Sequence, residues 1–261
     1  MCLAASLRGN SILITRPRHQ SEHLRWLIEK AGGEAVVIPT MEIVDPTSFD
    51  QLSLIGQRLA EFDIAIFISA NAVRKGLEWL RGCNTPWPDT LQVAAVGQAT
   101  AKALEASEIA VSISPAGKFD SEHLLMHPAM ENVADKKIII FRGQGGREHL
   151  ASILKERGAS VEYAEVYVRR KPDINLSEQL DTAQRNKICV IVTTSNEGLT
   201  NLIAMTDLDW RGWLFATNLI VLSERGARKA QELGFQNVTI SPQASDDAIM
   251  GTIKRIIEHC S

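Results

Sequence analysis

A glycine-rich loop between two arginines carries residue types that are suited to binding an anion. Residues 141–150 read FRGQGGREHL, after an apolar run and before a helical pattern. The dinucleotide fingerprint needs a third glycine where Glu148 stands, and the Gly-Lys-Ser/Thr of a P-loop is missing. Backbone N–H groups at a helix start can instead hold a carboxylate, with Arg142 or Arg147 adding further donors. The alternative is a glycine turn beside two solvated arginines.

Five further loops of small and polar residues also follow apolar runs. In an open parallel sheet, ligands bind beyond the carboxyl ends of the strands, where such loops lead into helices. The serines lack the G-x-S-x-G surroundings of a nucleophile, so hydrogen bonding or helix capping suits them better. The loops are Thr15-Arg16-Pro17, Ser69-Ala70-Asn71, Gly97-Gln98-Ala99-Thr100, Thr194-Ser195-Asn196 and Ser223-Glu224-Arg225.

The two tyrosines of the chain lie in one extended, polar stretch, residues 161–170. A tyrosine at a domain junction can bring a weakly acidic hydroxyl, with a pKa of about 10, to a ligand. The alternative is an amphipathic residue that covers a hinge. Both interpretations apply to Tyr167.

Neither the histidines nor the cysteines form a convincing metal site. The pairs His19/His23 and His123/His127 have helical spacing, but they lack the H-E-x-x-H glutamate and a third ligand nearby. The four cysteines are widely separated, with no C-x-x-C pair. We therefore expect surface or capping histidines, free thiols, and no metal site.

Short β-branched runs alternate with helical patterns along the whole chain, which predicts parallel sheets covered by helices on both faces. Gly32, Gly158 and Gly234 stand where three of the helices should end. Residues 161–170 and 36–46 are extended but too polar for core strands, so we expect them to be connectors. The β-branched runs, each of about strand length, are 11–14, 35–38, 64–69, 93–96, 111–113, 137–141, 161–168, 188–193, 219–222 and 238–240.

The chain also matches itself when it is shifted by 126 residues without gaps. The matches fall at corresponding strand ends and helix starts in one register, which favours two related α/β units over one large sheet. The matched residues include Arg16 with Arg142, Glu22-His23-Leu24 with Glu148-His149-Leu150, Gly32 with Gly158, and Ser69 with Ser195.

Composition limits the possible functions. The chain has 261 residues, 45% hydrophobic and 23% charged, which suits a globular protein of two domains. Its net charge of -3 gives no broad basic face for nucleic acid. No apolar run is long enough to cross a membrane, and the first residues lack the pattern of a signal peptide. We expect a protein of the cytoplasm.

Taken together, six motifs resemble uroporphyrinogen-III synthase of tetrapyrrole biosynthesis. They occur in order from Ile12 to the last helix, and each is loose by itself. The motifs are ILITRP, FDIAIFISANAV, VAAVGQATAKAL, FRGQGGREHLASILKERGASVEYAEVY, VTTSNEGL and SERGARKAQELG.

The resemblance implies an α/β fold of two related domains, each a parallel sheet flanked by helices, joined by two extended linkers. Residues 1–38 with 173–261 would form one domain and 45–163 the other, with 39–44 and 164–172 as the linkers. The repeats would then exchange their first strand-helix units.

The implied reaction cyclises hydroxymethylbilane to uroporphyrinogen III, with loss of water and inversion of the last pyrrole ring. It needs no cofactor, and we expect a monomer. Tyr167 matches the family's tyrosine in the second linker and is the implied proton donor. A non-catalytic two-domain binding protein for an anionic small molecule is the alternative, and a nucleotide-dependent enzyme is a third possibility. The residues implied to bind the substrate carboxylates are Thr15, Arg16, Ser69, Asn71, Gly97, Thr100, Arg142, Gly143, Gly146, Arg147, Thr194, Ser195 and Ser223.

Overall fold

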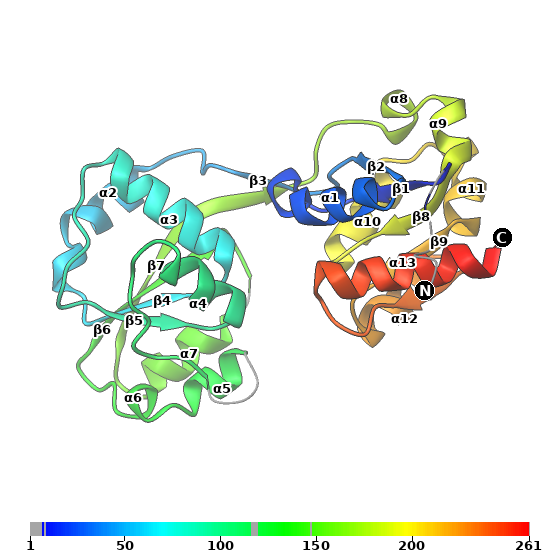
Figure 1. The fold of residues 1–261 in the computed structure, drawn as a ribbon. Helices are drawn as coiled ribbons and strands as arrows, with labels where there is room; N and C mark the ends of the chain where they lie inside the picture. Colours follow the sequence, from blue (N-terminus) through cyan, green and yellow to red (C-terminus); the bar gives the residue numbers. More distant parts are fainter. Residues whose placement is uncertain (1–6, 8, 116–119, 147, 261) are drawn as a thin grey trace. The chain divides into compact units, whose positions relative to one another are not determined.

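The chain divides into two compact units in a computed structural model that describes residues 7, 9–115, 120–146 and 148–260 (Figure 1). Unit 1 comprises Met1–Glu42 and Arg170–Ser261, and unit 2 comprises Ile43–Arg169. Both borders fall inside the predicted linkers, 39–44 and 164–172. The chain thus enters unit 2 once and returns once.

Unit 1 is built on a five-stranded parallel sheet in the order β10-β9-β8-β1-β2. Its strands are β1 (Ser11–Ile14), β2 (Glu34–Val37), β8 (Ile188–Val192), β9 (Asn218–Val221) and β10 (Val238–Ile240). Its helices are η1 (Arg18–Gln20), α1 (Glu22–Lys30), α8 (Leu176–Gln179), α9 (Thr182–Lys187), α10 (Asn196–Ala204), η3 (Leu208–Trp210), α11 (Arg211–Ala216), α12 (Glu224–Glu232) and α13 (Asp246–Cys260).

Side chains that alternate in direction along β1 contribute to both core layers of unit 1. Ile12 and Ile14 pack in one buried cluster with α1 and α13, whereas Leu13 packs in the other with α10 and α12. This is expected because successive strand side chains point to opposite faces of a sheet.

Unit 2 is built on a second five-stranded sheet in the order β3-β7-β6-β4-β5. Ile64 and Ile66 pack with α5 and α7, and Ala65 and Phe67 pack on the other face with α2 and α3. Its strands are β3 (Glu42–Val44), β4 (Ile64–Phe67), β5 (Gln92–Ala95), β6 (Lys137–Gly143) and β7 (Ser160–Arg170). Its helices are α2 (Asp50–Gln57), η2 (Leu59–Glu61), α3 (Ala70–Gly82), α4 (Gln98–Glu105), α5 (Ser121–Leu125), α6 (Pro128–Glu131) and α7 (His149–Glu156).

The two sheets follow one plan, as the shift of 126 residues predicts. Adding 126 to the residue numbers places β1 and β2 on β6 and β7, and β4 and β5 on β8 and β9. These strands have the same spatial order in the two sheets. The predicted strand at 111–113 is reduced to an isolated parallel bridge between Ala94 and Ile113.

The predicted connectors take more part in the sheet than expected. Residues 160–167 pair in parallel with β6, and Ala164, Val166 and Tyr167 are buried, so a linker that begins at residue 164 begins too early. Residues 42–44 of the other predicted linker form β3, next to β7. Arg170 Nη2 also donates to Glu42 Oε2 at 3.0 Å. The two crossing segments therefore lie side by side.

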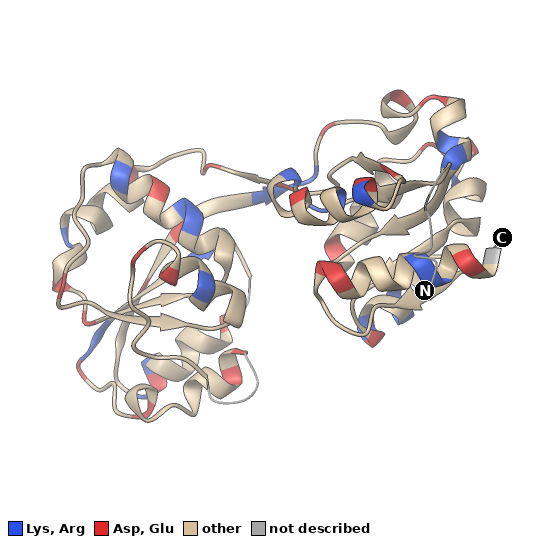
Figure 2. Cartoon of the chain, in the orientation of Figure 1, with Lys and Arg blue, Asp and Glu red and all other residues tan. Residues whose placement is uncertain are grey.

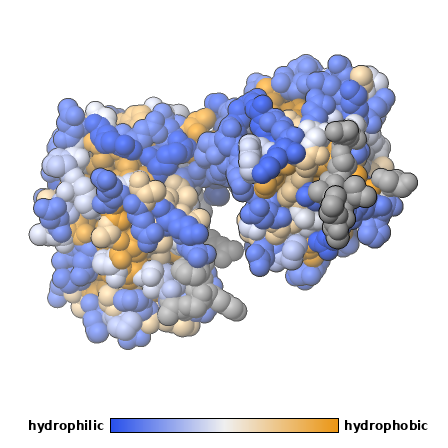
Figure 3. All heavy atoms as spheres, viewed as in Figure 1, coloured by the Kyte–Doolittle hydropathy of each residue, from blue (hydrophilic) through white to orange (hydrophobic). Residues whose placement is uncertain are grey.

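The charged residues of the two units are interspersed. Figure 2 shows Lys and Arg among Asp and Glu on helices of both units, in keeping with the small net charge of -3. On the face in Figure 3 hydrophilic residues predominate, with some hydrophobic residues exposed on unit 2. No helix within the described ranges has the length and apolar character needed to span a membrane.

Candidate active site

A pocket of about 370 Å³ lies at the carboxyl ends of β4, β6 and β7 in unit 2. It brings together Ser69, Arg142, Gly143, Gly146 and Tyr167, five of the residues predicted from the sequence. The same edge of an open α/β sheet is where ligands are generally bound. The pocket is also lined by Ser121, Glu122, His149, Tyr163 and Arg169, which the sequence did not single out for the site.

Tyr167 and Ser69 form the polar pair of this pocket. Tyr167 is 5% exposed, and its Oη lies 3.3 Å from Ser69 Oγ, where either hydroxyl can donate. Ser69 also begins α3, because its Oγ accepts from the N–H of Ala72 at 3.1 Å. The predicted capping role is confirmed. Since that bond uses Ser69 as an acceptor, its own O–H remains available to orient the phenol.

Gly143 is required because the Tyr167 ring lies directly against its backbone. A Cβ at position 143 would stand 2.5 Å from Tyr167 Cε2 and 2.6 Å from Cζ, closer than side-chain carbons approach. The register between β6 and β7 also shifts between Arg142 and Gly143, as in a bulge that re-aims a side chain. Glycine and bulge together fix where the phenol lies.

The carboxylate-binding hypothesis expects the Arg142 side chain to be exposed to solvent, but the side chain is buried. Its side chain is 3% exposed, and Nη1 donates to Glu148 Oε1 at 3.0 Å. Nε donates to the carbonyl of Gly143 at 3.2 Å, and Nη2 donates to the carbonyl of Gly145. The guanidinium also lies over the Tyr163 ring, with Cζ 4.5 Å from the ring centroid. Three hydrogen bonds thus join the guanidinium of Arg142 to residues 143–148.

Tyr163, in β7, also contacts Glu148. Its hydroxyl donates to the second carboxylate oxygen of Glu148. Burial, and next the bond to Glu148, raise the pKa of Tyr163 to about 12. The bond from Tyr163, and then the bond from Arg142, lower the pKa of Glu148. At neutral pH the phenol is therefore protonated and Glu148 is ionised.

Three predicted residues of unit 2 lie outside the pocket lining, and a fourth lies outside the described residues. Asn71 is in the first turn of α3, and Gly97 precedes α4. Thr100 is only 3% exposed, so direct contact between its side chain and a ligand is not favoured. Arg147 falls at a position that the structure does not describe.

In unit 1, Thr15 and Arg16 of the loop after β1 both have partners within the fold, although Arg16 Nε is buried without a hydrogen-bond partner. Thr15 is 2% exposed and donates from Oγ1 to the carbonyl of Val192 at 3.0 Å, so it is not displayed to a ligand. Arg16 donates from Nη2 to Asp246 Oδ1 at 2.6 Å, and its side chain is 10% exposed. Both residues lie at the predicted strand edge but face inward.

The loops after β8 and β9 bring Thr194, Ser195 and Ser223 together around a hollow of about 20 Å³. Ser195 Oγ accepts from the N–H of Gly198, and Ser223 Oγ accepts from the N–H of Gly226. The capping expectation thus holds here too. A hollow of this size encloses no organic ligand, so these groups can bind one only at an open surface.

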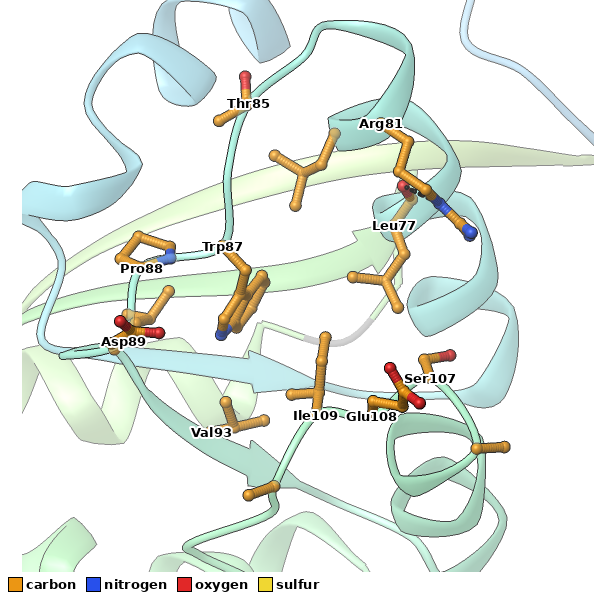
Figure 4. Close-up of a pocket in the computed structure, with 14 residues that line it drawn as sticks. Leu77, Arg81, Thr85, Trp87, Pro88, Asp89, Val93, Ser107, Glu108 and Ile109 are labelled. Atoms are coloured by element: carbon orange, nitrogen blue, oxygen red, sulfur yellow. Dashed lines mark hydrogen bonds between the residues drawn. The ribbon is translucent and has the colours of Figure 1, made fainter.

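A larger hollow, of about 640 Å³, lies at the opposite edge of the sheet of unit 2, where β5 begins. Figure 4 shows Leu77, Trp87, Val93 and Ile109 around it, with Glu108 at one side. It contains none of the residues predicted for the site. Because ligands of α/β sheets bind at the carboxyl edge, the smaller pocket is the better candidate.

One histidine of the two pairs caps a helix, which is one of the roles expected for them. His127 caps α6, since its Nδ1 accepts from the N–H of Ala129, and His123 Nδ1 lies 2.6 Å from Asp120 Oδ1. Among the described residues, no three His, Cys, Asp or Glu side chains form a group that could hold a metal ion. Cys83 is a free thiol, and Cys189 Sγ donates to the carbonyl of Ser11 at 3.6 Å.

Comparison with known proteins assigns the chain to a family. The family described as Uroporphyrinogen-III synthase HemD matches residues 22–251. Uroporphyrinogen-III synthase of Escherichia coli is 32% identical over 245 residues, covering 94% of this chain and all of that protein. The Salmonella typhimurium enzyme is 33% identical over 249 residues, with the same coverage. The chain belongs to the uroporphyrinogen-III synthase family.

Solved structures of this synthase family share the fold. A mutant uroporphyrinogen III synthase from Thermus thermophilus aligns with a TM-score of 0.63, 16% identity, and coverage of 96% of this chain and 99% of that one. The uroporphyrinogen-III synthetase of Helicobacter pylori gives a TM-score of 0.58 at 17% identity, covering 95% and 99%. The predicted fold class, two related α/β domains on parallel sheets, is confirmed.

Several residues in and around the pocket were not singled out for the site by the sequence. Glu148 and His149 entered only as members of the repeat, and Tyr163 only as the second tyrosine. Ser121 and Glu122 belong to α5, a five-residue helix too short to show a helical period. Their nearness to Tyr167 is a tertiary effect, and no local signal indicates it.

Proposed function

We propose that this chain catalyses the cyclisation of hydroxymethylbilane to uroporphyrinogen III, with loss of water and inversion of the last pyrrole ring. Membership of the synthase family carries the proposal, because relatives bearing that name align over their whole length. The alternative, a non-catalytic binding protein for an anionic small molecule, is not favoured by those relatives. Action in the cytoplasm as a monomer is part of the same proposal.

Tyr167 is the proposed catalytic residue. Departure of the substrate hydroxyl needs a proton or a strong hydrogen bond, and a phenol can supply either. The arrangement supports this role because the phenol lines the pocket and Ser69 lies within hydrogen-bonding distance. The cation left on the pyrrole chain is delocalised, so holding the last ring in the reacting geometry should contribute more than the proton transfer.

Backbone and hydroxyl donors are proposed to bind the substrate carboxylates. Gly143 and Gly146 line the pocket beside Tyr167, where loop N–H groups can reach an anion. Asn71 and Gly97 at helix starts of unit 2, and Arg147, remain candidates for other carboxylates. In unit 1 the candidates are Arg16, Thr194, Ser195 and Ser223.

Isomer analysis of the product tests the activity. The purified chain is incubated with freshly prepared hydroxymethylbilane, and the oxidised products are separated into type I and type III isomers. We expect type III in excess, formed faster than spontaneous closure. Formation of type I alone, at the spontaneous rate, would refute the proposal.

Tyr167→Phe tests the role of the phenol. Loss of a general acid typically lowers turnover by about 10²–10⁴-fold, and we expect a fall in kcat toward that range with an unchanged fold. Circular dichroism and urea unfolding serve as controls, because only one neutral hydrogen bond, to Ser69, is removed. Unchanged turnover would reduce Tyr167 to a packing residue.

A further inference from the structure

Arg142, Glu148 and Tyr163 contact one another beside the glycine loop, with Arg142 buried and the Glu148 side chain 67% exposed. Arg142 is the last residue but one of β6, Tyr163 lies in β7, and Glu148 precedes α7. One oxygen of Glu148 accepts from Arg142 and the other from the Tyr163 hydroxyl, while the guanidinium stacks on the Tyr163 ring. The three side chains thus satisfy one another across two strands and a loop.

The cluster holds the glycine loop from inside. The guanidinium donates to the carbonyls of Gly143 and Gly145, so it spans the loop it belongs to. Gly145 and Gly146 have φ of +71° and +107°, and a Cβ on Gly146 would stand 2.9 Å from Arg142 Nη2. Such a backbone shape is adopted readily by glycine, and here it fits around the arginine.

The same loop is tied to the strand that carries Tyr167. The N–H of Gln144 donates to the carbonyl of Tyr167 at 2.8 Å, and the N–H of Gly145 donates to Glu165 Oε1 at 3.3 Å. Gly143 meets the Tyr167 ring. A shift of the loop therefore changes the position of the phenol.

The charges also oppose direct carboxylate binding by Arg142. Its side chain is 3% exposed, and it is already paired with an ionised Glu148, so a substrate carboxylate would compete with that residue. Arg16, its counterpart in the repeat, pairs instead with Asp246 of α13, and the loop after Arg16 has no glycine. Only the loop of unit 2 is shaped around its arginine.

We propose that Arg142, with Glu148 and Tyr163, is a positioning residue that holds the loop at residues 143–146 against Tyr167, and does not itself bind the substrate. The proposal rests on the proposed synthase function. It assigns to Glu148 and Tyr163, which the repeat and the motifs leave without a role, a contribution to turnover.

Glu148→Gln separates positioning from direct binding, because the two roles predict opposite changes. A positioning cluster is weakened by the loss of the charged acceptor, so kcat should fall about tenfold. An arginine that binds substrate directly would be freed by the same change, and KM for the anionic substrate would fall. Glu156→Gln, at the exposed far end of α7, removes the same charge without touching the cluster and serves as the matched control.

A double-variant cycle completes the test. Arg142→Lys and Glu148→Gln should each lower kcat, and the double variant should be no slower than Arg142→Lys alone, since both remove one arrangement. Tyr163→Phe, which removes only the hydroxyl, should behave as a milder form of Glu148→Gln. If either of the other variants fails to fold, Tyr163→Phe can still distinguish positioning from direct binding.

Hydrogen exchange of the Gln144 amide gives a readout that does not depend on catalysis. Exchange should quicken in Glu148→Gln and remain unchanged in Glu156→Gln. Three results would overturn the positioning role. They are a double variant whose loss of kcat is the product of the two single losses, unchanged turnover and exchange in Glu148→Gln, and a lower KM in Glu148→Gln. If the wild type makes no type III isomer but exchange quickens as expected, the proposed function fails and the loop-holding role stands.

Discussion

Gly143→Ala should displace the proposed catalytic phenol by a predictable amount. The new Cβ would lie 2.5 Å from Tyr167 Cε2, whereas carbon atoms pack at about 3.5–4.0 Å, so the ring must move by roughly 1 Å. Overpacking of this kind costs about 1–3 kcal/mol of unfolding free energy. The displacement should also change the contact between Tyr167 Oη and Ser69 Oγ, which lie 3.3 Å apart.

The effect of Gly143→Ala on turnover should be larger than its effect on stability. A misplacement of 1 Å can cost about 10²-fold in rate, and we expect a loss of that order in kcat for the type III product. Urea unfolding measures the stability change. Gly82→Ala is the matched control, because nothing lies within 4 Å of its added methyl group, and it should be neutral or slightly stabilising.

The ring itself must be the cause of these losses. In a Tyr167→Ala background, Gly143→Ala should cost almost no stability, because the clashing atoms are gone. An equal stability loss in both backgrounds, or wild-type turnover for Gly143→Ala alone, would refute the close approach as the reason for glycine.

Two further predictions concern stability. Asp63 accepts from the N–H of Lys137 at 2.8 Å and from Lys136 Nζ at 2.9 Å, and these bonds lower its pKa below the ordinary 3.8. The pKa of Asp63 is lower in the folded than in the unfolded protein, so its ionised form stabilises the fold. Asp63→Asn should therefore cost about 1 kcal/mol of unfolding free energy at pH 7, and this cost should disappear as the pH falls through the folded pKa. An equal cost at pH 2 would contradict this reasoning. Ser195→Ala should cost about 1 kcal/mol in urea unfolding by removing the cap on Gly198, and Ser195→Asn should cost much less.

Local signals in the sequence were sufficient for most of the fold. Apolar runs located the strands, because a buried parallel strand is apolar on both faces. Gly32 and Gly158, at equivalent places in the repeat, have φ of +82° and +88°, which a helix end of this kind needs. The shift of 126 residues then indicated the plan shared by the two sheets.

The pairing of β7 could not be predicted in the same way. Its polar residues are stabilised by partners far along the chain, as Glu162 is by Arg58, with Nη2 to Oε2 at 3.0 Å. Such partners satisfy polar groups that would otherwise not suit a strand. The stretch therefore has the composition of a connector and the hydrogen bonds of a strand.

The arginine pair shows why site chemistry is harder to predict than the fold. Arg16 and Arg142 occupy equivalent positions in the repeat, yet one donates to Asp246, 230 residues away, and the other to Glu148, six residues away. Residue type and register determine that a guanidinium stands at the strand end. Its availability to a ligand depends on whether a carboxylate within the fold already occupies it.

Unlike the paired arginines, the capping serines remain available to a ligand, because helix capping and anion binding use different parts of the hydroxyl. Ser195 and Ser223 each accept a backbone N–H through Oγ, which uses the hydroxyl as an acceptor only. The O–H of each remains a donor, and a donor is what a carboxylate requires. A serine at a helix start can therefore cap the helix and bind an anion at the same time. Arg142 differs, because its buried guanidinium is already paired with Glu148, and a substrate carboxylate would have to compete with that residue.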